Sequence, residues 1–246
     1  MSTALLMASE AAAEAAERTF TIDGPLVVAS WEMFGMTWNL TESVVVQWIV
    51  MGIILVICLI LGTGLKVVPT TRRQALAEWL VTFVNDMVDG SMGEKYKSYR
   101  PYIGILLVYV VLCNLISLVG LRAPTADVSV TGTLAIITFF MTQYNRAKTG
   151  GVKGYFKAFI DPLPFMLPSN IIGEVSNPVS MALRLFGNMV AGMVIGGLIY
   201  WALGNVMPPV VIPAVASLYF DIFSGVIQAY IFTMLTMSYI SNAECE

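Results

Sequence analysis

Histidine is absent from the 246-residue chain, and charged residues make up only 12% of it. The lack of histidine removes the commonest metal ligand and the commonest acid or base near neutral pH. Soluble domains carry about 25% charged and about 45–50% apolar residues, whereas this chain is 57% hydrophobic. The composition therefore excludes a soluble enzyme. It predicts an all-α integral membrane protein that forms a single membrane domain.

Cysteine is scarce, and its spacing excludes a metal or redox centre. Cys58, Cys113 and Cys245 lie far apart, and the first two stand in apolar runs. We expect them to be packing residues, and we expect no bound metal or cofactor. The phosphate-binding pattern GxxxxGK[ST] is also missing, so the chain is not expected to bind ATP in that manner. Nothing in the sequence suggests nucleic-acid binding.

The beginning of the chain lacks the positively charged segment that opens a signal peptide. We therefore interpret residues 1–42 as a polar segment outside the bilayer. Because a spanning helix needs about 20 apolar residues, the uncharged stretches that follow predict helices at 43–65, 101–121 and 128–145.

Two further helices are predicted in the C-terminal third, at 169–203 and 210–241, separated by a segment rich in glycine and proline. Each is longer than an ordinary span. A helix of about 34 residues reaches about 50 Å, and the hydrocarbon core is about 30 Å thick. Both helices are therefore expected to tilt strongly in the bilayer. The total is five spans.

Lysine and arginine predict the orientation of these spans, because such residues favour the cytoplasmic side. One basic group lies between the first and second spans, and another follows the third: Lys66, Arg72, Arg73, Lys95, Lys97 and Arg100, then Arg146, Lys148, Lys153 and Lys157. The N-terminus is then outside and the C-terminus in the cytoplasm. We expect a multi-pass protein of a bacterial inner membrane.

Residues 71–90 differ from the spans because their apolar residues follow the spacing of one helical face. Thr71 and Gln74 fit a capping box at the start of this helix. Two interpretations remain open: an amphipathic helix on the inner membrane surface, or a cytoplasmic helical hairpin that packs on the bundle.

Arg184 is the most costly residue of the long C-terminal region, where only Glu174 and Asp221 are also charged. A central arginine costs about 2.5–3.5 kcal/mol on insertion scales, so an ionisable residue there indicates function. Glu174 lies ten residues earlier, about 15 Å away along the helix, which is too far for contact. Asp221 is a possible partner, although the sequence does not fix the pairing.

Polar residues form one stripe on each long helix. The first stripe contains Asn177, Ser180, Arg184 and Asn188, and small residues continue it. The second contains Ser217, Asp221, Ser224 and Gln228. Two such helices can line an aqueous route while turning apolar sides to lipid. The alternative is that these polar and small side chains only hold helices together.

Three segments resemble one family, subunit a of the F-type ATP synthase. They are SNPVSMALRLFGNMVAG around Arg184, PTADVSVT at 124–131, and IQAYIFTMLTMSYIS at 227–241. The resemblance implies a stator subunit that packs against a rotating ring of c subunits, each with one carboxylate. Two offset half-channels pass protons to and from the ring, and Arg184 faces the passing carboxylate and separates them. Subunit b and the rest of the synthase are further expected partners, with ATP chemistry in other subunits.

Matching positions imply roles for further residues. The outer half-channel would contain Asn188, Asp221, Ser224 and Gln228, with Asp127 at its mouth or acting as a helix cap. The inner half-channel would contain Glu174, Ser176, Asn177 and Ser180. Many family members have glutamate where this chain has Met193, and some have histidine at Asp221. A proton relay through a Glu–His pair is therefore not expected. Protons remain the preferred ion, with Na⁺ as the alternative.

Three other classes of membrane protein compete with this interpretation. A secondary transporter typically has two repeated halves, and residues 43–145 and 169–241 show no repeat. A passive channel needs a filter motif or a ring of identical chains, and neither is suggested. A purely structural subunit would tolerate replacement of Arg184 without loss of transport.

Overall fold

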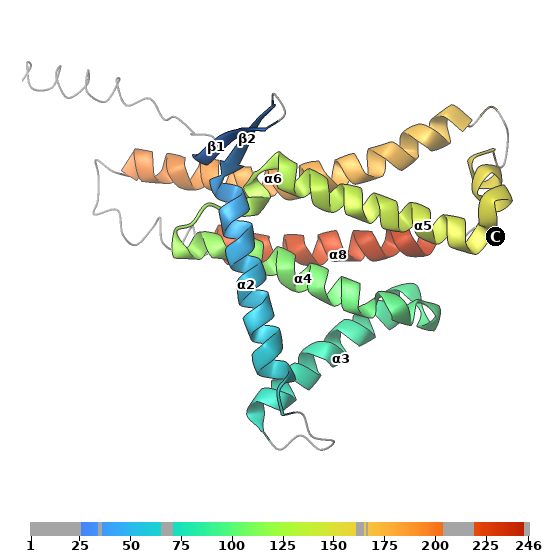
Figure 1. Ribbon diagram of the computed structural model, residues 1–246, viewed down its shortest axis with the longest axis horizontal. Helices are drawn as coiled ribbons and strands as arrows, with labels where there is room; N and C mark the ends of the chain where they lie inside the picture. The colour runs from blue at the N-terminus through green and yellow to red at the C-terminus, as the bar shows by residue number, and fades with distance from the viewer. Residues whose placement is uncertain are drawn as a thin grey trace, which may run out of the picture.

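The computed structural model describes residues 26–33, 36–64, 71–160, 165, 167–203 and 219–243, and most of them are helical (Figure 1). The longer helices are α2 (Glu42–Gly62), α3 (Arg72–Met92), α4 (Arg100–Leu115), α5 (Val128–Ile160), α6 (Leu167–Leu203) and α8 (Gly225–Asn242). Short 3₁₀ segments are η1 (Glu94–Tyr99), η2 (Ile116–Val119) and η3 (Pro124–Ala126), and η5 (Tyr219–Ser224) is π-helical.

Within the described residues, four helical stretches are long and apolar enough to cross a membrane: Glu42–Gly62, Glu94–Val119, Leu167–Ile199 and Ile222–Asn242. An all-α membrane protein is what the composition predicted. The sequence predicts five spans. The additional one, at 128–145, forms the first part of α5 and is not among these four stretches. That helix runs on to Ile160, past the basic residues where the predicted span ended. Its backbone departs from helical geometry at Gly151, which has φ +61°.

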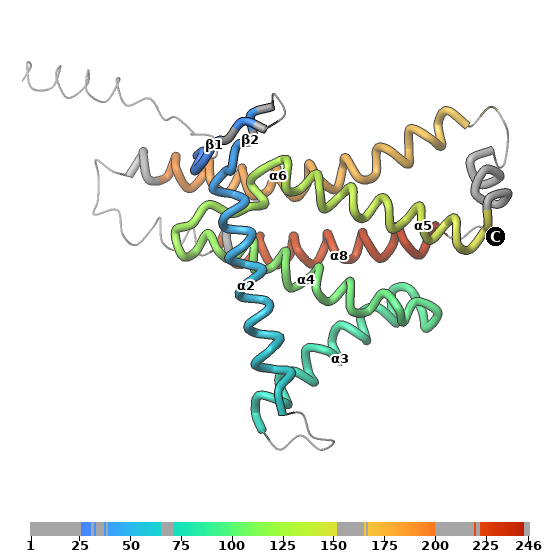
Figure 2. The backbone as a smooth tube through the Cα atoms, viewed as in Figure 1, coloured from blue at the N-terminus to red at the C-terminus, as the bar shows by residue number. Residues whose placement is uncertain are grey.

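The arrangement of the helices places α8 at the centre of the bundle. In α8, Phe232, Met237 and Ile240 are at most 1% exposed, and they pack against α4, α6 and the end of α3. The helices α5 and α6 run side by side along much of their length, whereas α2 crosses them steeply (Figures 1 and 2). The 37 residues of α6 correspond to about 55 Å of helix. A strong tilt of this helix in the bilayer stays a prediction, based on that length.

The two halves of α3 have different surroundings. Val84, Val88 and Met92 are buried against α4 and α8, whereas Leu76 and Trp79 are 58% and 66% exposed. The C-terminal half thus packs on the bundle, as the hairpin interpretation expects, and the N-terminal half presents an apolar surface. The prediction of a capping box is wrong. The helix begins after Thr71 as expected, but the side chain of Thr71 makes no capping hydrogen bond.

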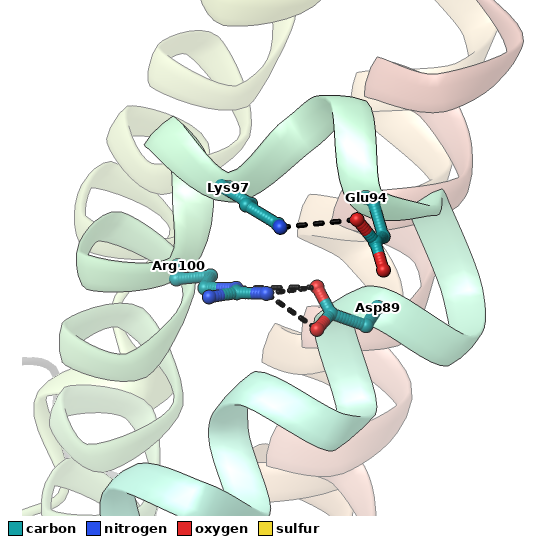
Figure 3. A network of polar contacts seen from close by, with 4 residues as sticks. All are labelled: Asp89, Glu94, Lys97 and Arg100. Atoms are coloured by element: carbon teal, nitrogen blue, oxygen red, sulfur yellow. Dashed lines mark hydrogen bonds and ion pairs between the residues drawn. The ribbon is translucent and has the colours of Figure 1, made fainter.

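An ion pair joins α3 to α4 where the chain turns between them (Figure 3). The guanidinium of Arg100 donates to Asp89 Oδ1 from Nε at 3.1 Å and from Nη2 at 2.6 Å. These bonds hold the pKa of the Asp89 carboxyl below its ordinary value. Nearby, Lys97 pairs with Glu94 at 3.0 Å on a far more exposed surface.

Two strands precede the first helix, and the sequence analysis did not anticipate them. β1 (Val27–Met33) and β2 (Met36–Thr41) form an antiparallel pair, and β2 leads directly into α2. Several predictions lie outside the described residues: most of the outer segment 1–42, the break after α6, residues 210–218 of the last helix, and Cys245. Cys113 is buried among apolar residues as expected, whereas Cys58 is exposed.

Candidate ion path

Arg184 lies on an exposed face of α6. On a neighbouring face of the helix, Met181 and Leu185 are 1% and 0% exposed and pack into the bundle. Among the described residues, no carboxylate forms an ion pair with Arg184. The guanidinium is therefore accessible to a partner outside the described residues.

The polar stripe of α6 is exposed along its length. Asn177, Ser180 and Asn188 are exposed like Arg184. A Cβ atom built on Gly187 or Gly196 would meet nothing within 4 Å. The face is thus lined by small and polar residues that are largely exposed, and it leaves room for another helix to approach closely.

One pair of predicted path residues is brought together. Asn188 Nδ2 donates to Gln228 Oε1 at 2.6 Å, which joins α6 to α8, and Gln228 is only 3% exposed. Ser224 is half-buried at the junction of η5 and α8. The backbone of Asp221 belongs to the π-helical η5, but its side chain lies outside the described part of the structure. Single π-helical turns are frequent at functional sites.

A second group of polar residues lies farther toward the start of α6. Glu174 accepts a hydrogen bond from Gln143 Nε2 at 2.7 Å through Oε2, and its Oε1 accepts one from Arg146 Nη2. We call Gln143, Arg146 and Glu174 the Glu174 cluster. The cluster borders a cavity of about 290 Å³ between α5, α6 and α8, which Asn177, Pro178 and Asn242 also line.

The predicted inner residues therefore divide into two sets. Glu174 and Asn177 line the cavity, whereas Ser176 and Ser180 are exposed and are not among its lining residues. Sequence reasoning counted Arg146 only as a cytoplasmic charge and passed over Gln143. Their spacing of three residues on α5 places them on one face, but the sequence offers no means of matching that face to Glu174.

Asp127 acts as the cap of α5, which was one of the two roles expected for it. Its Oδ1 accepts a hydrogen bond from the backbone N–H of Ser129 at 2.9 Å. Asp127 also lines a cavity of about 620 Å³, together with Asn39 and Gln47. The other lining residues of this cavity come from β2, α2, α4 and α5. No lining residue of this cavity belongs to α6 or α8.

A buried polar group that sequence reasoning missed joins α4, η3 and α8. Asn114 Nδ2 donates to the Gly225 carbonyl at 2.8 Å, and Asn114 Oδ1 accepts from Thr125 Oγ1 at 2.7 Å. Asn114 and Thr125 are both 0% exposed. We call these three residues the Asn114 network. It fixes the start of α8, one turn before Gln228.

Met193 packs where many members of the resembled family have glutamate. It is half-buried against Ala123, Ala126 and Met189, between α6 and the η3 segment. The position therefore contributes an apolar contact in this chain. Asn188, Gln228 and Ser224 supply neutral oxygen atoms nearby, and no described cluster of acidic, cysteine or histidine side chains is suited to hold a metal ion.

Comparisons with known proteins agree with this architecture. The family model described as ATP synthase A chain matches residues 44–241. The sodium ion specific ATP synthase subunit a of Propionigenium modestum is 38% identical, over 82% of this chain and 74% of that protein. ATP synthase subunit a of Bacillus subtilis is 34% identical, over 86% and 94% of the two chains. A Bradyrhizobium protein, ATP synthase subunit a 2, is 34% identical over 83% and 89%.

Proposed function

The chain belongs to the family of ATP synthase subunit a, the ion-translocating stator subunit of the membrane sector, and we propose that Arg184 separates two half-channels in it. An ion enters from outside, neutralises a carboxylate of the rotating c-ring and travels with it through lipid. It leaves through the second half-channel on the cytoplasmic side.

The exposure of Arg184, to which the described residues supply no ion partner, carries this proposal. A charge at membrane depth requires compensation, and the uncovered face of small residues can accept a helix of another subunit. A ring carboxylate supplies the opposite charge. The fixed cation favours the ionised carboxylate and lowers its pKa, so the site releases its ion before it passes. Arginine also stays protonated at any working pH.

The two half-channels are assigned from the polar residues on either side of Arg184. Asn188, Ser224, Gln228 and Asp221 form the outer path. Glu174 and Asn177, which line the cavity of about 290 Å³, form the inner path, with Ser176 and Ser180 on the neighbouring exposed surface. Asp127 and its cavity stand at the outer mouth. A single charge crossing 100 mV gains about 2.3 kcal/mol, which drives the rotation.

Protons are the proposed coupling ion, carried by Asp221 and water. Sodium is the second candidate, because one relative with 38% identity is named sodium ion specific. The hydrogen-bonded Asn188 and Gln228 provide neutral oxygen ligands that a sodium path needs. Both candidates leave the role of Arg184 unchanged.

The chain is a multi-pass membrane protein that assembles with the rest of the synthase. We propose that the c-ring covers the Arg184 face and that subunit b is a further neighbour. The named relatives come from bacteria, in agreement with a bacterial inner membrane. We propose that the N-terminus lies outside and the C-terminus in the cytoplasm, because basic residues favour the cytoplasmic side.

The test compares ATP-driven ion uptake in vesicles that contain the complete complex, with wild type or Arg184→Ala, in sodium-free buffer and with added Na⁺. Loss of uptake in a fully assembled variant complex is expected, because the barrier between the half-channels is removed. Uptake at the wild-type rate would refute the stator role of Arg184. The response of the wild type to Na⁺ identifies the coupling ion. The control is Ile172→Ala, an exposed apolar residue of the same helix that is assigned to neither path.

A further inference from the structure

We propose that Arg146 is a positioning residue of the inner path: it neutralises Glu174, so that the cavity between α5, α6 and α8 passes cations without retaining them. The inference rests on the proposed function, because it concerns how ions leave or enter through the inner half-channel. It assigns Glu174 a structural and electrostatic task in place of a role as an ion-carrying station.

The geometry of the carboxylate is the first observation. Both oxygens of Glu174 are engaged, Oε2 by Gln143 at 2.7 Å and Oε1 by Arg146. Both donors come from α5, three residues apart, and the acceptor comes from α6. The carboxylate is therefore held in one orientation by two bonds from a neighbouring helix, and an ion would have to displace a charged donor to bind it.

The low exposure of this pair is the second observation. The side chains of Arg146 and Glu174 are 14% and 20% exposed, whereas those of Lys97 and Glu94, which also pair, are 55% and 84% exposed. A partly buried charge is screened less by water and salt than a surface charge. Removal of Arg146 therefore takes the paired cation away from the Glu174 carboxylate, and removal of Glu174 takes this carboxylate away from Arg146, so either change alters the charge that acts on ions in the cavity.

The chemistry of the cavity is the third observation. Its lining includes the hydroxyl groups of Thr138 and Thr142 and the amides of Asn177 and Asn242. Pro178 has no N–H, so the helix offers no donor to the carbonyl four residues earlier, which is that of Glu174. These neutral oxygens suit a hydrated cation. An unpaired carboxylate among them would bind a cation firmly, and Arg146 prevents this.

The experiment measures ATP-driven uptake by inverted vesicles as a function of the external concentration of H⁺ or Na⁺, because external ions then enter by the inner path. The variants are Arg146→Gln, Glu174→Gln and the double variant. Lys97→Gln is the matched control, since it removes a cation from an exposed ion pair. The amount of subunit in the purified complex is measured for each.

Each single variant is expected to lower the maximal uptake rate by about tenfold, because one uncompensated charge remains in a partly buried site. Arg146→Gln should also lower the half-saturating ion concentration, since the free carboxylate retains cations. Glu174→Gln should not lower it, because the remaining guanidinium repels cations. The double variant restores neutrality and should recover to within about threefold of wild type. Lys97→Gln should match wild type.

Recovery in the double variant separates an electrostatic task from a purely mechanical one. A double variant that transports no better than the worse single variant would overturn the proposal, as would single variants that match wild type. If Arg146→Gln fails to assemble, assembly of the double variant supports the proposal and its failure refutes it. The Arg184→Ala test is independent, so a failure of the stator role is distinguishable from a failure of this inference.

Discussion

The Asn114 network and the Glu174 cluster both tie helices of the bundle together, but they do so with opposite chemistry. The Asn114 network is neutral, and its two side chains are 0% exposed. The Glu174 cluster is charged, keeps 14–20% exposure and borders a cavity. The difference shows that this chain uses amides and hydroxyls where solvent is excluded, and charges where a cavity gives access to water.

The largest effect is expected from a variant that places a charge in the neutral site. Asn114→Asp removes the donor to the Gly225 carbonyl and introduces a carboxylate into a fully buried site. An uncompensated buried charge costs about 3–5 kcal/mol, so the variant subunit should be lost from the purified complex. The opposite exchange, Glu174→Gln, removes a charge from the accessible site and should leave assembly intact. If the purified complex contained equal amounts of the Asn114→Asp and Glu174→Gln subunits, the proposed difference between the two sites would be wrong.

A smaller effect is expected from a change in the space around the Asn114 network. A Cβ atom on Gly225 would lie 3.1 Å from Asn114 Cβ, so Gly225→Ala forces α4 and α8 apart. Overpacking of this kind costs about 1–3 kcal/mol, and the melting temperature of the detergent-solubilised complex should fall. Gly132→Ala is the matched control on α5, because a Cβ there meets nothing within 4 Å. It should keep or raise the melting temperature.

The smallest effect on stability is expected from the ion pair of Asp89 and Arg100, which lies outside the two clusters. Folding lowers the pKa of the Asp89 carboxyl, so the pair adds stability above the ordinary aspartate pKa of about 3.9, and this contribution is lost as the pH falls through the lowered pKa. Arg100→Gln should lower the melting temperature slightly at pH 7. The difference from wild type should disappear once the pH falls below the lowered pKa of Asp89. A difference that persists there would show that Arg100 acts by packing alone.

Much of the helical organisation could be predicted because it depends on local properties of the chain. The predicted helix at 71–90 is observed at 72–92, and that at 101–121 as α4 with η2, at 100–119. The two strands were missed because residues 27–41 were judged only by their position before the first span. The length of α5 was missed because the basic residues after 145 were expected to end the helix, although they only end the apolar stretch.

The candidate site was predictable in part, for a related reason. Arg184 and its stripe follow from helical spacing and from the cost of charge in a bilayer. The partners of each polar residue cannot be predicted in this way, because they depend on the rotation and axial position of neighbouring helices. Nothing in the sequence distinguishes Gln143 and Arg146 from other polar residues of α5, or relates Asn114 to a carbonyl 111 residues later.

The sequence by itself determined the membrane character of the chain, the course of its helices and the position of its one costly arginine, since composition and periodicity act within single segments. The family resemblance, carried by the residues around Arg184, was confirmed over 44–241. The tertiary structure alone decided that Glu174 pairs with Arg146 and that Asn188 bonds to Gln228. These contacts join residues 28 and 40 positions apart, and only the packing of whole helices brings such residues together.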